Sequence, residues 1–530
     1  MTLGRDRLGE KPLYYGWQGR VFLFGSQLSA LRAHPAFIGQ IERGALSLLL
    51  RYNTIPSPYS IYQGIFKLPP GTLLTVSLHQ PDPAINSYWS GASVARNGVA
   101  NPFSGTAEQA VDELEFLLMD SIRQQMMADV PLGAFLSGGV DSSTVAALMQ
   151  AQSSRQVKTF TIGFDTPGYN EAEHAKAVAK HLGTDHSEHY VTSKEALDMV
   201  ALLPAIYDEP FADASQIPTL LVSRLARQHV TVALSGDAGD ELFCGYRRYL
   251  LAEKLWRRIF PLPIPIRELL AQAITVIPPG SWNQIAMMMN LALPPSKRLE
   301  NVGDKLHKAA GILASQSTDD LYFGLISHWR NPESTVKNGT EPPTLISGKT
   351  PDLSGLSDVQ RMMALDMLHY LPDDVLTKVD RASMGVSLET RAPFLDHRIV
   401  EFAWRLPQSM KVNEGRSKWI LRQVLYRHVP EALIERPKMG FGVPLDAWLR
   451  GALREWAEGL LDETRLRREG FFHATSIRKM WAEHLSGRRN WSYHLWNVLM
   501  FQSWLEHQPQ GVSAGDRTIS EFRMTGMDTK

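Results

Sequence analysis

A glycine-rich turn between an apolar run and a helix-forming run constrains this chain more than any other feature of its sequence. Residues 130–136 are mostly apolar and predict a buried parallel strand, and residues 142–149 predict a helix. Between them lies Ser137-Gly138-Gly139. Glycines let the backbone approach an anion closely, and the unpaired N–H groups at a helix start point toward that anion. The turn therefore predicts a phosphate-binding loop, to which Ser137, Ser142 and Ser143 add hydroxyl donors.

Asp141 places a carboxylate among these donors, which is favourable when a divalent cation lies between it and the phosphates. The loop is not a Walker A motif, because no Gly-Lys-Ser/Thr follows four variable residues. Ser137-Gly-Gly-Val-Asp-Ser142 instead resembles the Ser-Gly-Gly-x-Asp-Ser loop of the ATP-pyrophosphatase superfamily. That resemblance implies an enzyme that cleaves ATP between the α- and β-phosphates and adenylates a substrate oxygen. The alternative is a glycine-rich turn that binds no ligand.

Strands and helices alternate after this unit. Further strands are predicted at residues 158–164, 187–191 and 230–235. Alternation with helices of ordinary length predicts an α/β fold with a doubly wound parallel sheet. Ligands of such sheets bind at the carboxyl ends of the strands, where the turns at 137–141, 164–165 and 235–241 all fall. We therefore expect one nucleotide site built from three loops. Beyond residue 250 the pattern is mostly helical.

The charge balance and the cysteine content restrict which binding partners and which cellular compartment we expect for this protein. The 530 residues include 55 Lys and Arg and 55 Asp and Glu, so the formal net charge is zero and nucleic acid is not an expected partner. Cys244 is the one cysteine, which excludes an intrachain disulfide and fits a reducing cytosol. The start of the chain is charged and unlike a signal peptide, and no run of about 18 or more apolar residues occurs. We expect a cytoplasmic protein without a membrane span.

A second cluster follows the last predicted strand of the sheet. Asp237, Asp240 and Glu241 lie in the glycine-rich turn 235–246. Three carboxylates so close together are costly unless a cation neutralises them. Together with Asp141 they supply oxygen ligands for Mg²⁺, the hard cation expected to bridge phosphates. The alternative is an acidic surface turn in which the Asp residues cap a helix.

Lysines and carboxylates recur in a third group of segments farther along the chain. These segments are residues 376–384, 387–396, 416–418 and 436–444. Glu389, Arg391 and Asp396 would form an ordinary charged face if they were exposed. Lys438 lies in a Gly/Pro-rich loop, the kind of segment that can bring an ammonium over a phosphate. Each segment alone is a weak indication, because a solvated lysine is the alternative.

The identity and order of these clusters closely resemble the synthetase domain of the asparagine synthetase family across about residues 105–505. The resemblance implies a doubly wound parallel sheet of adenine-nucleotide hydrolase-like type with a helical carboxyl-terminal part. It also implies ATP and Mg²⁺ as cofactors of an ATP-dependent amide ligase. Such a ligase forms β-aspartyl-adenylate from aspartate and ATP, releases pyrophosphate, and lets ammonia attack the activated carbonyl to give asparagine.

Site residues follow from this resemblance position by position. The positions that match the family's ATP- and pyrophosphate-binding loop are Leu136, Ser137, Gly138, Gly139, Asp141 and Ser142. Those that match contacts to the adenosine are Ile162, Ser235 and Gly236. The positions that match the Mg²⁺ carboxylates are Asp141 and Asp240.

Four further positions match the family's catalytic and acceptor residues. Lys438 matches the lysine that stabilises the adenylation transition state and the departing pyrophosphate. Lys418 and Glu389 match residues that line the acceptor and intermediate pocket. Asp237 stands where the asparagine enzymes often carry Glu, at the border of the acyl-adenylate. The identity of the acceptor therefore stays open.

The start of the chain resembles another part of the same family. Residues 1–90 have the pattern of short strands joined by turns. The segments that resemble the second half of the family's glutaminase domain are residues 4–15, 24–31 and 64–72. In that family the domain begins with a cysteine whose thiolate attacks the glutamine amide. Here the second residue is Thr2 and Cys244 lies in the other half. We expect a β-rich, partial glutaminase-like domain without its nucleophile, and synthesis that depends on ammonia.

Composition suggests where the parts of the chain meet. Residues 91–105 are rich in Gly, Ala, Asn and Ser and predict a linker. The capping-box pattern Thr106-x-x-Gln109 then opens the ATP-binding domain, residues 106–507. Residues 508–530 are polar and weakly patterned, and predict a disordered tail.

Two alternatives to an aspartate-specific ligase stay open. The same adenylation chemistry could act on another carboxylate, such as a sugar uronate or a peptide. The second alternative is a protein without catalytic activity that acts as the partner of a glutaminase. Both enzymatic hypotheses predict small-molecule substrates, namely the carboxylate and ammonia. As protein partners we consider a second copy of this chain in a homodimer, or a separate glutaminase.

Overall fold

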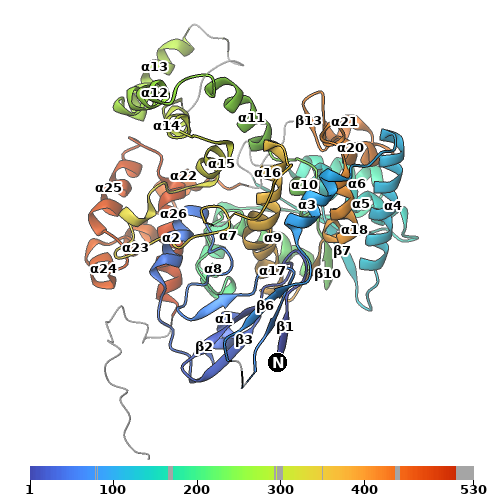
Figure 1. The fold of residues 1–530 in the computed structure, drawn as a ribbon, viewed down its shortest axis with the longest axis horizontal. Helices are drawn as coiled ribbons and strands as arrows, with labels where there is room; N and C mark the ends of the chain where they lie inside the picture. The colour runs from blue at the N-terminus through green and yellow to red at the C-terminus, as the bar shows by residue number, and fades with distance from the viewer. Residues whose placement is uncertain are drawn as a thin grey trace, which may run out of the picture.

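The computed structural model describes residues 1–77, 79, 81–164, 171–291, 294, 302–348, 350–435 and 442–508. These residues form a mixed α/β fold in which helices surround one parallel sheet, and a β-rich amino-terminal region lies at the lower edge of the view (Figure 1). The prediction of an α/β fold with a parallel sheet is confirmed.

In the described part of the chain, the parallel sheet has the strand order β11-β10-β7-β8-β9. The strands are β7 Leu132–Phe135, β8 Lys158–Phe164, β9 Asp185–Val191, β10 Val232–Leu234 and β11 Glu389–Arg391. β8 is rich in β-branched and aromatic residues and is buried along nearly its whole length, as expected of a strand covered on both faces. The chain adds strands on one side of β7 and then on the other, so the order reverses between β7 and β10. Open α/β sheets bind ligands at such a point.

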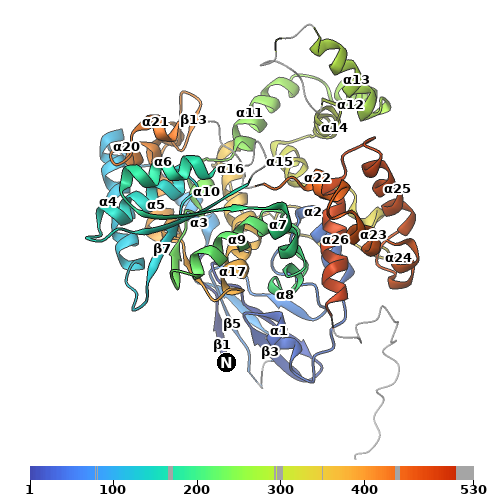
Figure 2. The ribbon, with the colours of Figure 1, turned by 180° about the vertical axis from the view of Figure 1, so that it is seen from behind.

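Helices cover both faces of this sheet (Figure 2). Those of one face are α4 Ala107–Gln125, α5 Val140–Ala151, α6 Ala172–Leu182 and α20 Trp419–Tyr426. Those of the other face are α7 Ser193–Val200, α9 Gln216–Arg227 and α17 Thr377–Met384. The expected capping box of α4 is confirmed: the Gln109 N–H donates to Thr106 Oγ1 at 3.2 Å, and the Thr106 N–H donates to Gln109 Oε1 at 2.8 Å.

The amino-terminal region contains two antiparallel sheets, of order β1-β5-β6 and β3-β2-β4, and helices α1 and α2. Their bounds are β1 Thr2–Gly4, β2 Tyr14–Gln18, β3 Val21–Gly25, α1 Leu28–Arg32, α2 Arg43–Tyr52, β4 Ile65–Lys67, β5 Thr72–Thr75 and β6 Ala84–Ser87. The core of this region is continuous with that of the rest, because Tyr14 and Leu49 belong to the same cluster of buried side chains as Trp504. A buried ion pair between Lys67 and Glu209 also joins the two parts.

Residues 91–105 differ from the linker that their composition predicts. Gly91–Ala100 form helix α3, which packs on α18 (His397–Arg405). Gly98 lies so close to this neighbour that a Cβ there would be 2.7 Å from the backbone carbonyl carbon of Trp404. Close packing thus outweighs the low helix propensity of Gly, Asn and Ser.

Beyond about residue 250 the described part of the chain is mostly helical, as predicted. The short helices α8 Leu203–Ile206 and α10 Gly239–Leu242 precede this part, whose earlier elements are α11 Arg247–Ile259, α12 Ile264–Val276, α13 Pro279–Asn290, α14 Val302–Leu313, α15 Thr318–Ile326, η2 Pro332–Ser334, α16 Asp358–Leu365, the π-helix η3 Asp366–Leu376 and η4 Pro393–Leu395. Its later elements are α19 Gln408–Lys411, β12 Val412–Asn413, β13 Arg416–Ser417, α21 Glu431–Ile434, α22 Leu445–Arg450, α23 Arg454–Leu460, α24 Glu463–Glu469, α25 Ala474–Leu485 and α26 Ser492–Glu506.

Two further sequence-based expectations concern the carboxyl-terminal tail and the absence of a membrane span. Of the tail predicted at 508–530, all but Gln508 lies outside the described residues. Within the described ranges no single helix is long and apolar enough to cross a membrane, although the bent pair Gly239–Ile259 and Ile264–Val276 passes that test when the two are taken together.

Candidate active site

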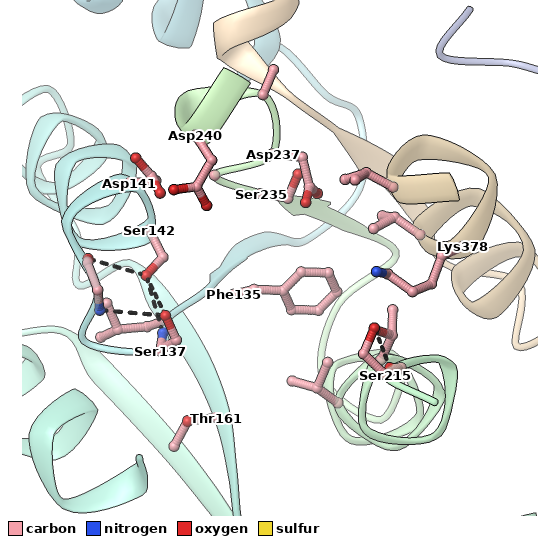
Figure 3. Close-up of a pocket in the computed structure, with 18 of the residues that line it drawn as sticks. Phe135, Ser137, Asp141, Ser142, Thr161, Ser215, Ser235, Asp237, Asp240 and Lys378 are labelled. Atoms are coloured by element: carbon pink, nitrogen blue, oxygen red, sulfur yellow. Dashed lines mark hydrogen bonds between the residues drawn. The ribbon is translucent and has the colours of Figure 1, made fainter. Parts of the chain in front are cut away.

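The glycine-rich turn predicted as a phosphate loop connects β7 to α5 (Figure 3). Gly138 has a φ of +71°, and a Cβ there would lie 2.8 Å from the backbone nitrogen of Ala175 in α6, so the turn requires glycine. The Ser137 N–H donates to Ser142 Oγ at 3.1 Å, and the two hydroxyl oxygens lie 3.0 Å apart. The turn thus places two hydroxyls beside the first N–H groups of α5, as an anion site requires.

A pocket of about 260 Å³ lies at the carboxyl ends of β7, β8 and β10. The predicted site residues that line it are Leu136, Ser137, Gly139, Asp141, Ser142, Ile162, Ser235, Gly236, Asp237 and Asp240. Gly138 does not line the pocket and contributes the shape of the turn instead. Residues that are about a hundred positions apart in the sequence meet here because the carboxyl ends of parallel strands share one edge of the sheet.

Asp141 and Asp240, the carboxylates predicted to hold Mg²⁺, both pair with the ammonium of Lys418. The distance from Asp240 Oδ1 to Lys418 Nζ is 2.7 Å, and Asp141 Oδ2 contacts the same nitrogen. Burial alone would lower the pKa of Lys418, but the two carboxylates outweigh burial and raise it. Gly245 leaves room for the lysine, since a Cβ there would be 2.1 Å from Lys418 Cε. Lys418 was expected to line the acceptor pocket, whereas here it holds the two carboxylates together.

This carboxylate pair fits a Mg²⁺ ion. Mg²⁺ commonly binds through one or two carboxylates together with substrate phosphates and water. Asp141 and Asp240 already converge on one cationic group at the start of α5. An ion held by them would neutralise negative charge on the phosphates of a nucleotide. Over the described ranges, no group of three or more His, Cys, Asp or Glu side chains forms a metal site of protein ligands alone.

The opposite end of the pocket carries a lysine that the sequence analysis did not single out. Lys378 Nζ lies 2.6 Å from Asp213 Oδ2 and 3.7 Å from Asp374 Oδ1. Burial alone would lower the pKa of Lys378, but Asp213 and then Asp374 raise it well above its usual value. Burial would raise the pKa of Asp213, yet the Lys378 ammonium outweighs burial and lowers it. Lys378 and Asp213 are therefore both charged at neutral pH.

The π-helix η3 sets the position of this lysine. η3 contains Pro372 and leads directly into α17, where Lys378 is the second residue. The Thr377 hydroxyl donates to the Pro372 carbonyl at 3.0 Å. π-helical turns are rare in proteins, but those that occur often lie at functional sites. The available sequence signal was the spacing Asp374-x-x-x-Lys378, because charges four residues apart face each other on a helix.

Like Gly138 and Lys418, the predicted residue Glu389 is not among those that line the pocket. Glu389 begins β11 opposite Val232, at the amino end of the sheet, while the pocket lies at the carboxyl end. Its side chain is 50% exposed and accepts a hydrogen bond from Arg391 Nε at 2.7 Å. Lys438 lies in 436–441, outside the described residues. The catalytic roles of both residues stay predictions.

A parallel sheet whose central strand ends in an anion-binding turn, beside carboxylates that fit Mg²⁺, is the arrangement of a nucleotide-using enzyme. Residues 113–506 match the model of the asparagine synthase family, and residues 1–89 match that of the glutamine amidotransferase domain. The chain belongs to the asparagine synthase family and is an ATP-dependent amidotransferase-type ligase.

Three relatives illustrate how much of the chain the similarity covers. Asparagine synthetase [glutamine-hydrolyzing] 1 of Bacillus subtilis (strain 168) is 28% identical over 527 residues, or 96% of this chain and 77% of that protein. A putative asparagine synthetase [glutamine-hydrolyzing] of Mycobacterium bovis is 32% identical over 509 residues, or 94% and 73%. Putative asparagine synthetase [glutamine-hydrolyzing] 2 of Methanocaldococcus jannaschii is 39% identical over 386 residues, or 72% and 68%. These names do not favour either alternative weighed above.

Proposed function

We propose that this chain adenylates the side-chain carboxylate of aspartate and aminates it to asparagine. The observation that carries this proposal is the convergence of Asp141 and Asp240 on one cationic group at the start of α5, directly beside the phosphate loop. The sheet would then be of the adenine-nucleotide hydrolase-like type, with the nucleotide at the reversal between β7 and β10.

The chain's residues would divide the work along the pocket. Ile162 and the pair Ser235-Gly236 would contact the adenosine, while the loop from Leu136 to Ser142 would bind the phosphates through N–H and hydroxyl groups. Mg²⁺ held by Asp141 and Asp240 would neutralise phosphate charge. Lys438 would stabilise the pyrophosphate as it departs.

Adenylation of the aspartate side chain precedes its amination. An oxygen of the aspartate β-carboxylate attacks the α-phosphorus, and the bond from that phosphorus to the α,β-bridging oxygen breaks, which releases pyrophosphate. Ammonia then attacks the acyl carbon of the mixed anhydride, loses a proton to solvent, and displaces AMP. The products are asparagine, AMP and pyrophosphate.

For the chain as printed we expect ammonia to be the nitrogen donor. Cys244 is the one cysteine of the sequence, and it is buried in the synthetase half. Burial raises the pKa of the Cys244 thiol to about 11. A thiolate is needed to attack the amide of glutamine. Cys244 is therefore unsuited to be a glutaminase nucleophile.

The decisive experiment incubates the purified chain with ATP, Mg²⁺, aspartate and ammonium, and follows AMP, pyrophosphate and asparagine together. We expect equal amounts of the three products, and a rate lower by about 10²-fold or more in Lys438→Ala. Pyrophosphate release with another carboxylate, and none with aspartate, would refute the acceptor. No AMP with any carboxylate would refute the catalytic proposal.

A further inference from the structure

We propose that the tip formed by helices α12 and α13 is a docking site for an anionic lipid surface. The tip consists of the outward faces of these two helices and the residues that flank them, from Phe260 to Leu291. This inference goes beyond the proposed function and does not depend on it, because it concerns where the protein binds and not which reaction it catalyses.

The tip stands apart from the rest of the molecule. Figures 1 and 2 both show α12, α13 and α14 at the upper edge of the view, away from the parallel sheet and from the amino-terminal sheets. In the described part of the chain, α12 and α13 pack mainly on α14, and α14 packs in turn on α15. The chain bends by 114° between α11 and α12, so α12 runs across the end of α11. Each of the two tip helices therefore has one face toward α14 and another toward solvent.

Helix α12 has the reverse of the polarity that a surface helix usually shows. Arg267 is its buried residue, and the guanidinium donates a hydrogen bond to the Ser315 carbonyl at 2.6 Å. Ile266, Leu269 and Leu270 are 47%, 66% and 43% exposed. A surface helix normally turns its apolar stripe toward the core and its charged side chains toward water. The reversed arrangement indicates that the outer face of α12 contacts something apolar.

Helix α13 continues this apolar surface. It buries Ala286, whereas Met288 is 69% exposed and Leu291, which follows the helix, is 88% exposed. Among the described residues, eleven of the twenty-five large apolar side chains that are exposed lie in residues 260–291. Arg267 and Glu268 are the charged residues of that stretch. Covering so concentrated an apolar surface would remove it from water, which is favourable.

Positive charge flanks the tip. Residues 247–313, from the start of α11 to the end of α14, contain ten Lys and Arg against four Asp and Glu, although the whole chain has 55 of each kind. Lys254 and Arg258 on α11 are exposed, as are Lys305 and Lys308 on α14. Basic residues beside an apolar helical face are the combination that binds the surface of a membrane rich in anionic lipid.

The occupant that these features fit is a lipid surface that the tip enters without crossing. A two-fold interface with a second copy of this chain would bring the same basic flanks of both copies together, and like charges repel. An anionic surface instead attracts them. α12 has 13 residues and α13 has 12, whereas a helix needs about 20 apolar residues to span the hydrocarbon core. We therefore expect peripheral binding.

Sedimentation of the full chain with vesicles tests this inference. One type of vesicle contains phosphatidylcholine alone, and the other an equal mixture of phosphatidylcholine and phosphatidylglycerol. We expect the partition coefficient of the wild type to be higher for the anionic vesicles by about tenfold or more at low salt. Raising the salt from about 0.05 M to about 0.5 M should remove most of that difference, because salt screens the charges. Equal binding to both types of vesicle at low salt, or no binding, would overturn the inference.

Two double variants separate the apolar contribution from the basic one. Leu269→Gln with Met288→Gln should lower the partition coefficient for anionic vesicles by about tenfold or more, because less apolar surface enters the lipid. Lys254→Gln with Arg258→Gln should lower it by a similar factor at low salt and much less at high salt. The matched controls, at positions exposed elsewhere on the molecule, are Phe116→Gln with Met127→Gln and Lys180→Gln with Lys479→Gln. Tip variants that bind as tightly as the wild type would refute the assignment.

A fluorescent label reports the contact without removing it. Met288→Cys places a thiol at the tip, while the native Cys244 is buried. We expect the emission of an environment-sensitive label at Met288→Cys to shift to shorter wavelength with anionic vesicles. The same label at Met127→Cys, which is also exposed, should not respond.

Light scattering identifies the other possible occupant, a second copy of this chain. A wild type that is dimeric, a variant Leu269→Gln with Met288→Gln that is monomeric, and a label at Met288→Cys that does not respond to vesicles would together show self-association. That combination would overturn the inference. A label that responds to anionic vesicles, with a wild type and variant of the same oligomeric state, would support it.

Discussion

Lys418 Nζ lies 2.7 Å from Asp240 Oδ1 and also contacts Asp141, so one buried ammonium occupies the place between the two carboxylates that would hold Mg²⁺. Lys418 thereby contacts both acidic side chains at once. Removing it should change both the stability of the protein and its response to Mg²⁺.

Lys418→Met removes the buried ammonium that contacts both Asp141 and Asp240. We expect the free energy of unfolding to fall by about 3 kcal/mol in metal-free buffer, since the loss of one partner of a buried ion pair is strongly destabilising. Added Mg²⁺ should restore part of this loss, because the two carboxylates can then share the metal. Thermal unfolding with and without Mg²⁺ measures both effects. Lys479→Met, at an exposed position of α25, is the matched control, and equal Mg²⁺ shifts in both variants and the wild type would contradict this account.

Gly138→Ala and Gly139→Ala form a matched pair in the phosphate loop. At Gly138 the added Cβ meets backbone of α6 at 2.8 Å and φ is +71°, so the turn must deform. At Gly139 the nearest atom is the Ser137 hydroxyl oxygen, 3.3 Å away, and φ is −81°. We expect Gly138→Ala to weaken ATP binding by about tenfold or more and Gly139→Ala to do much less, because the lost contacts are hydrogen bonds to charged phosphates. Titration with ATP tests the ranking, and a reversed order would refute it.

Glu241 predicts a dependence of stability on pH. Burial, reinforced by Asp240, raises its pKa to about 7, and the Tyr246 hydroxyl donates to it at 2.7 Å. Between the ordinary pKa of glutamate and about 7 the folded state holds a proton that the unfolded state has lost. Stability therefore falls as pH rises through this interval.

Glu241→Gln removes this titration while keeping a side chain of similar shape. Relative to the variant, the wild type should lose up to about 3 kcal/mol between about pH 5 and pH 8. Denaturant unfolding of both proteins across that range measures the difference. Parallel pH profiles would show that the carboxyl of Glu241 titrates normally in the folded state.

Cys244 should react slowly with alkylating reagents. Burial raises its pKa to about 11, so the thiolate fraction near neutral pH is about 10²-fold below that of an exposed cysteine. We expect iodoacetamide to modify the native chain at least that much more slowly than the chain in denaturant. Mass spectrometry of timed samples gives both rates. Rapid labelling of the native protein would remove the argument against a thiolate nucleophile in this chain.

Much of the sheet and its loops could be predicted from the sequence because their signals are local. The strands β7, β8 and β10 are apolar or β-branched runs, and the residue types of the glycine-rich turns after β7 and β10 indicate a binding function. β11 escaped prediction, because Glu389-Thr390-Arg391 is short, carries charges at both ends, and becomes a strand by pairing with β10 far away in the sequence.

The same limit applies to the site. Asp141 and Asp240 were found because each lies in a recognisable turn. The place of Lys378 depends on how η3 packs and on its pairing with Asp213, which no local pattern encodes. Helix α3 was missed for a related reason, because its residues are weak helix formers that are held by contact with α18.

Tyr14, Leu49 and Trp504 belong to one cluster of buried side chains. The ion pair of Lys67 and Glu209 is also buried, with both side chains only 5% exposed. These contacts make the unfolding of the two parts of the chain cooperative. The amino-terminal sheets and the carboxyl-terminal helix have one interior, so neither can open without exposing apolar surface and an uncompensated charge of the other. Calorimetry should therefore detect a single melting transition, in which residues 1–89 and residues 113–506 unfold together.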